Sequence, residues 1–186
     1  MFSVAKNRAN NLRMNKQKAV FLDRDGTLIE DKHYLNTPDG VELFPDVPES
    51  LLRLHKAGYL LVVVTNQSGI ARGLVTEQNV KDIHERLQTL LQPYGVAIHA
   101  FYHSPHAADS NHPLRKPNPG MLLLAAKEHR ISLDESFMIG DKPLDVEAGH
   151  RAGTRSILIS DELPQTCSPD CVTSDFKTAV DWILSR

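Results

Sequence analysis

Short apolar runs alternate along the chain with longer segments in which apolar residues recur every three or four positions. The short runs predict buried strands at residues 20–23, 59–65, 96–103, 136–141 and 155–160. The longer segments predict helices at residues 47–57, 76–91, 119–129, 144–152 and 176–184. Strands that alternate with helices are typical of a mostly parallel sheet with helices on both faces. We therefore expect an α/β fold with three layers, α/β/α.

One domain accounts for this pattern. We expect it to cover residues 18–186, with residues 1–17 as an N-terminal extension. The extension is polar and basic, and it lacks the apolar segment of a secretory signal. A chain of 186 residues is long enough for one substantial core, and no internal repeat or linker divides it.

Net charge and composition argue against several classes of binding partner. The net charge of −2 gives no reason to expect binding to nucleic acid or to an anionic membrane. No apolar run approaches the roughly 20 residues of a membrane span. Cys167 and Cys171 favour two free thiols in a reduced cytoplasm, although their spacing would also suit a metal half-site or a disulfide. We expect a cytoplasmic monomer.

Polar side chains gather where the predicted strands end. Asp23 and Asp25 close the first strand, Thr65 closes the second, and Asp141 closes the fourth. Lys116 follows the loop after the third strand. Because ligands bind beyond the carboxyl ends of parallel strands, we expect these five residues to form one site.

This group of side chains suits phosphoryl transfer. Three carboxylates favour a hard cation such as Mg²⁺, while a lysine, a hydroxyl and turn N–H groups favour a phosphate. One carboxylate can act as a nucleophile, and a second, two residues on, faces the same side and can act as general acid and base. Taken singly, each residue has an ordinary structural explanation. Asp145, for example, suits a helix cap as well as it suits the site.

The segments FLDRDGTL, VVVTNQSG, RKP and IGDKPLD together resemble the four ordered motifs of the haloacid dehalogenase (HAD) superfamily of phosphatases. The resemblance covers residues 19 to about 160 and implies a Rossmann-like fold. It implies that Asp23 is the nucleophile and that Asp25 is the general acid and base. It further implies that Thr65 and Lys116 hold the phosphoryl group. Mg²⁺ would bind Asp23, the backbone carbonyl of Asp25, and Asp141.

The segments between the motifs are too short for the inserted cap of many superfamily members, so we expect a capless protein. Its loops resemble those of the heptose-bisphosphate phosphatases, with histidinol-phosphate phosphatases as close relatives. The implied substrate is a small sugar phosphate, foremost D-glycero-D-manno-heptose 1,7-bisphosphate at its 7-phosphate. The implied substrate contacts are Asp31, Lys32, His33, Tyr34, Asn66, Gln67, Ser68, Arg115 and Lys142.

One loop departs from this subgroup, which usually has four Cys and His zinc ligands before RKP. Those positions here hold Ser104, His106, His112 and Leu114. Serine is a poor zinc ligand and leucine is none, whereas structural zinc normally needs four N or S ligands. We therefore expect no bound zinc, with His106 and His112 as the remainder of a degenerate site.

Two other classes of function stay open at this point. A phospho-acceptor regulatory domain also gathers aspartates and a lysine at strand ends, but Asp25 argues against it because a general base promotes rapid hydrolysis. A binding protein that has lost its chemistry would not need the complete acidic set.

Overall fold

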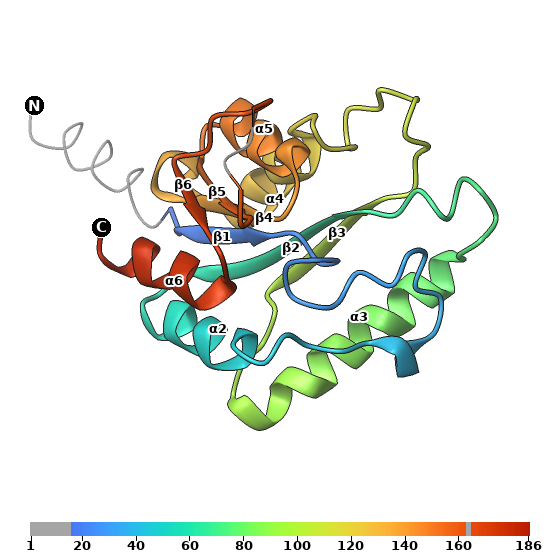
Figure 1. The fold of residues 1–186 in the computed structure, drawn as a ribbon, viewed down its shortest axis with the longest axis horizontal. Helices are drawn as coiled ribbons and strands as arrows, with labels where there is room; N and C mark the ends of the chain where they lie inside the picture. Colours follow the sequence, from blue (N-terminus) through green and yellow to red (C-terminus); the bar gives the residue numbers. More distant parts are fainter. Residues whose placement is uncertain (1–15, 163–164) are drawn as a thin grey trace, which may run out of the picture.

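The computed structural model describes residues 16–162 and 165–186, and Figure 1 shows a sheet between two layers of helices. Its six strands are all parallel, in the order β3-β2-β1-β4-β5-β6. The expected three-layer α/β fold is confirmed. The strands are β1 (Ala19–Leu22), β2 (Leu60–Asn66), β3 (Ala100–Ser104), β4 (Phe137–Gly140), β5 (Arg155–Ile159) and β6 (Cys171–Thr173).

The helices divide between the two faces of the sheet. One face is covered by α2 (Val47–Lys56), α3 (Glu77–Leu91) and α6 (Phe176–Leu184), and the other by α4 (Gly120–His129) and α5 (Pro143–Ala152) (Figure 1). Short 3₁₀ helices lie at Pro38–Gly40, Gln92–Tyr94 and Leu133–Glu135. Among the described residues, no helix is long and apolar enough to cross a membrane.

The central strand β1 is buried on both faces, as its uninterrupted apolar sequence predicts. Val20 and Leu22 pack into the core beneath α2, α3 and α6, whereas Ala19 and Phe21 pack toward α4 and α5. All four are fully buried. Since side chains alternate along a strand, a strand between two helical layers needs apolar residues at every position. This burial fixes the point at which the following polar residues emerge.

The structure differs from the strand predictions in two places. The third strand begins at Ala100 instead of residue 96, because the Gln88 side chain of α3 binds the carbonyl of Val96 (3.1 Å) and the N–H of Ile98 (2.8 Å). Those groups therefore have partners outside the sheet. The sequence pattern also missed β6, a three-residue edge strand too short to show a period.

The other predictions concern the ends of the chain. Residues 1–15 of the expected extension lie outside the described residues. Gln17 already pairs with Ile131, so backbone pairing begins one residue before the expected boundary at residue 18. Cys167 and Cys171 are both free thiols, as expected.

Candidate active site

The four polar signals of the sequence meet at one edge of the sheet. Asp23 follows β1, Thr65 lies near the end of β2, and Asp141 follows β4. The strand order places β1 between β2 and β4, at the point where the order along the chain changes direction. Open parallel sheets bind ligands at such a point, beyond the carboxyl ends of the strands. Lys116 reaches the same place from the loop between β3 and α4.

Three charged side chains form a buried triad, which we define as Asp23, Lys116 and Asp145. The Lys116 Nζ lies 2.7 Å from Asp23 Oδ1 and 2.7 Å from Asp145 Oδ1, and it donates to the Val64 carbonyl at 2.8 Å. Burial opposes the charge on Lys116, but the two carboxylates outweigh it and raise the pKa of the lysine. The triad therefore keeps a cation beside Asp23 where water is excluded.

Asp145 serves both as a helix cap and as a member of the site, the two roles that the sequence left open. Its Oδ2 accepts a hydrogen bond from the Lys142 N–H (3.1 Å) at the start of α5, while its Oδ1 faces Lys116. The carboxylate fits because residue 140 is glycine. A Cβ on Gly140 would lie 2.4 Å from the carboxylate carbon.

Asp25 is held at the edge of the triad by neighbouring polar side chains. Its Oδ2 accepts a hydrogen bond from Gln67 Nε2 (2.9 Å) and lies 3.5 Å from Thr65 Oγ1. Both of its oxygens also face the guanidinium of Arg24, which the sequence analysis did not single out. A charged residue between two aspartates is expected to be exposed to solvent, yet Arg24 is only 1% exposed.

The acidic groups fit a divalent cation. Asp23, Asp141 and Asp145 offer oxygens within 4.8 Å of one another. Both oxygens of Asp145 already face a donor, Lys116 Nζ and the Lys142 N–H, whereas Asp23 meets Lys116 through Oδ1 alone. The carboxylates left for a cation are therefore Asp23 and Asp141. Asp141 Oδ1 is buried and has no hydrogen-bond partner among the described residues. Burial and the nearby charge of Asp23 raise the pKa of Asp141 to about 6. A hard cation would satisfy that oxygen and neutralise the repulsion.

Gly26 explains how the chain brings these carboxylates together. It adopts a left-handed conformation (φ +82°), which favours glycine, and a Cβ there would lie 2.4 Å from Asp141 Oδ2. The turn after β1 therefore passes directly against the residue that follows β4.

A cavity of about 280 Å³ opens beside Asp25. We define its rim as Asp31, His33, Tyr34 and Lys142, which line it together with Gln67 and Ser68. Lys142 Nζ lies 3.1 Å from Asp31 Oδ2 and 3.5 Å from Asp141 Oδ2. Burial opposes the charge on Lys142, but these carboxylates outweigh it and raise the pKa of the lysine. Lys32, predicted to contact substrate, pairs with Glu42 and is not among the residues that line this cavity.

Asn66 and Arg115 hold the loop that carries Lys116. The amide of Asn66 binds both the N–H (3.1 Å) and the carbonyl (3.0 Å) of Lys116. Arg115 donates to the carbonyl of His106 at 3.0 Å. Asn66 also lines the cavity, so its predicted substrate contact and this structural contact are compatible.

The loop at the degenerate zinc positions does not fit a structural zinc ion. The rings of His106 and His112 stack with centroids 3.4 Å apart, and His112 Nδ1 accepts a hydrogen bond from the Leu114 N–H at 3.2 Å. Ser104 is fully buried. Within the part of the chain that the structure describes, the aspartate cluster is the only group of three metal-ligating side chains.

Comparison with known proteins identifies the family. The family model for polynucleotide kinase 3 phosphatase matches residues 18–181. The D-glycero-beta-D-manno-heptose-1,7-bisphosphate 7-phosphatase of Helicobacter pylori is 38% identical over 172 residues, which cover 91% of this chain and 99% of the relative. The chain belongs to the HAD phosphatase family that includes the heptose-bisphosphate phosphatases. The enzyme of the same name from Pasteurella multocida is 39% identical over 174 residues, covering 90% of this chain and 91% of that protein.

A solved structure of this phosphatase family has the same fold. The D,D-heptose 1,7-bisphosphate phosphatase of B. bronchiseptica, crystallised with magnesium and phosphate, superposes with a TM-score of 0.80 at 28% identity. The match covers 90% of this chain and 98% of that one. The resemblance to HAD phosphatases is therefore confirmed.

Proposed function

We propose that the protein is a Mg²⁺-dependent phosphatase that removes the 7-phosphate of D-glycero-D-manno-heptose 1,7-bisphosphate through an aspartyl-phosphate. The observation that carries the proposal is the placement of the Asp23 carboxylate. It lies at the end of β1, 2.7 Å from a buried lysine and within reach of Asp141. The names of the relatives support the substrate.

The residues of the chain account for both halves of the reaction. A carboxylate oxygen of Asp23 attacks phosphorus, the bond from phosphorus to the sugar oxygen breaks, and Asp25 gives that oxygen its proton. Asp25 then takes a proton from water, whose oxygen attacks phosphorus and releases phosphate from Asp23. Lys116 stabilises the charge on the phosphoryl oxygens.

A cation would be held by Asp23, Asp141 and the backbone carbonyl of Asp25. When bound, it would neutralise negative charge on the phosphate and on the two carboxylates. Ser68 and Gln67 line the same cavity as the rim, which supports the proposed contacts with the sugar and its phosphate.

The proposal is tested by turnover of heptose bisphosphate, histidinol phosphate and simple phosphate esters, with and without Mg²⁺. We expect the heptose bisphosphate to have the highest kcat/KM and activity to need Mg²⁺. Asp23→Asn should abolish turnover and leave the folded structure intact, whereas Asp39→Asn, at an exposed aspartate, should match the wild type.

Two results would contradict the proposal. A heptose bisphosphate no better than a generic ester would remove the substrate assignment. A folded Asp23→Asn variant with full activity would remove the nucleophile. Time-resolved phosphate release separates rapid turnover from the stable aspartyl-phosphate of a phospho-acceptor domain.

A further inference from the structure

Arg24 contacts both carboxylate oxygens of Asp25, the proposed general acid and base. Its Nε lies 3.2 Å from each oxygen of Asp25, and its Nη2 lies 3.0 Å and 2.9 Å from the same two oxygens. A planar guanidinium that faces both oxygens restricts the rotation of the carboxyl group. Asp25 follows β1 in a turn, where its side chain would otherwise be free to rotate.

The remaining nitrogen of Arg24 faces a histidine from a distant part of the chain. Nη1 lies 3.3 Å from Nε2 of His84, which belongs to α3 and is 8% exposed. Burial, together with Arg24 and His103, lowers the pKa of His84 to about 3. The ring is therefore neutral at physiological pH, and its unprotonated nitrogen can accept a hydrogen bond from the guanidinium.

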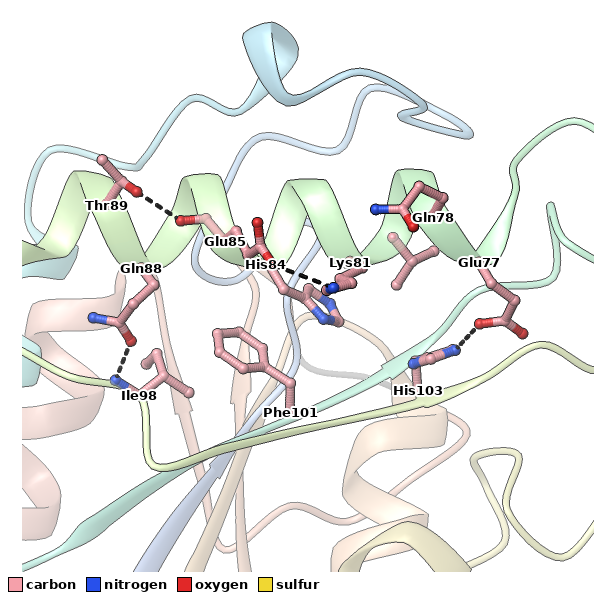
Figure 2. Close-up of a pocket in the computed structure, with 11 residues that line it drawn as sticks. Glu77, Gln78, Lys81, His84, Glu85, Gln88, Thr89, Ile98, Phe101 and His103 are labelled. Carbon is pink, nitrogen blue, oxygen red and sulfur yellow. Dashed lines mark hydrogen bonds and ion pairs between the residues drawn. The ribbon is translucent and has the colours of Figure 1, made fainter.

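His84 is itself fixed by packing. Its ring stacks on Phe101 of β3, with ring centroids 4.5 Å apart and planes 18° from parallel. Figure 2 shows the two rings side by side between α3 and β3. They line a groove of about 840 Å³. His103 lies in the same groove but turns toward Glu77, 2.6 Å away (Figure 2).

We propose that Arg24 and His84 are positioning residues that hold the carboxyl group of Asp25 in line for proton transfer to the departing alcohol. This inference rests on the proposed phosphatase function. When Asp25 gives up its proton, it becomes the carboxylate that the guanidinium binds, so the contact strengthens as charge develops. His84 fixes the position of Arg24, because without the imidazole the buried N–H of Nη1 would have no hydrogen-bond acceptor at that position.

A role in proton transfer can be separated from a purely structural role by the leaving group. An alkyl phosphate needs its leaving oxygen protonated, whereas p-nitrophenolate departs with little help. The measured quantity is kcat/KM, which includes only the steps up to release of the alcohol. A general structural defect would lower kcat/KM for both esters by the same factor.

The decisive variants change His84 and spare the residues that touch the substrate. His84→Phe keeps a ring against Phe101 but removes the acceptor, and His84→Gln restores one. His103→Gln is the matched control, since it removes a ring that packs edge-on against His84, with centroids 6.2 Å apart, but keeps the contact between His84 and Arg24. Thermal unfolding shows which variants remain folded.

We expect His84→Phe to lower kcat/KM for heptose bisphosphate about tenfold and for p-nitrophenyl phosphate less than about twofold. His84→Gln should recover most of the loss, and His103→Gln should stay within about twofold of the wild type on both esters. Arg24→Lys, which loses the planar fork, should lower kcat/KM for the heptose ester about a hundredfold.

Equal losses on the two esters, or no loss in folded His84→Phe, would overturn the inference and leave the proposed function intact. A wild-type protein that hydrolyses neither ester would overturn the proposed function and this inference with it.

Discussion

The buried triad and the rim lie at the same edge of the sheet, but the fold holds them in different ways. The side chains of the triad are 0–8% exposed, and each contacts another charge of the triad at 2.7 Å. In the rim, the paired side chains of Lys142 and Asp31 are 44% and 36% exposed. Changes in the triad should therefore affect stability and catalysis together, whereas changes in the rim should affect substrate binding alone.

The largest effect is expected from Lys116→Met. It leaves two buried carboxylates without their cation, and breaking a buried ion pair costs about 3–5 kcal/mol of folding free energy. Urea unfolding measures this loss, and turnover should fall to background. Lys142→Met is the matched control in the rim and should change the free energy of unfolding by less than about 1 kcal/mol. Equal losses of unfolding free energy in the two variants would contradict the difference between the triad and the rim.

A smaller effect on the triad is expected from Asp145→Asn. The amide is nearly isosteric and can still accept the hydrogen bond from the Lys142 N–H, but it no longer balances the charge of Lys116. Loss of such a supporting group typically lowers activity about 10–100-fold. The fall should appear in kcat for the heptose ester. A variant with unchanged kcat would show that Asp145 acts only as a helix cap.

The sequence predicts the triad better than the rim for a physical reason. An apolar strand buried on both faces must end where polar residues begin, so the position of Asp23 follows from the pattern of β1. Asp145 stayed ambiguous because one carboxylate binds a backbone N–H and a lysine at once. No period in the sequence marks such a double contact.

Arg24 and Lys32 show what a sequence pattern cannot reveal. Both are cations beside aspartates, yet one is buried against His84, sixty positions away in the chain, and the other pairs with Glu42 near the surface. Only the packing of α3 on the sheet separates the two cases. The rim likewise depends on two loops that carry no regular pattern, so its members followed from the family resemblance alone.

In the rim, Asp31→Asn should raise KM for heptose bisphosphate about threefold to tenfold and leave kcat unchanged. The substitution releases Lys142 from one partner without changing the charges of the triad. Because the pair is more than a third exposed, the free energy of unfolding should move by less than about 1 kcal/mol. Steady-state kinetics and urea unfolding on the same preparation check both expectations. A fall in kcat equal to that of Asp145→Asn would remove the distinction between rim and triad.

The smallest effect is expected from treatment with a zinc chelator. The His106–His112 stack occupies the degenerate zinc loop, and His112 Nδ1 already accepts a backbone hydrogen bond. Two thiolate positions of the usual set are Ser104 and Leu114, so the four N or S ligands of structural zinc are incomplete. A zinc chelator followed by fresh Mg²⁺ should therefore leave kcat, KM and the unfolding midpoint unchanged. The double substitution Ser104→Cys and Leu114→Cys supplies two thiolates beside these histidines and serves as the chelator-sensitive control. Stoichiometric zinc in the wild-type protein, or activity restored by zinc but not by Mg²⁺, would show that the loop depends on a metal after all.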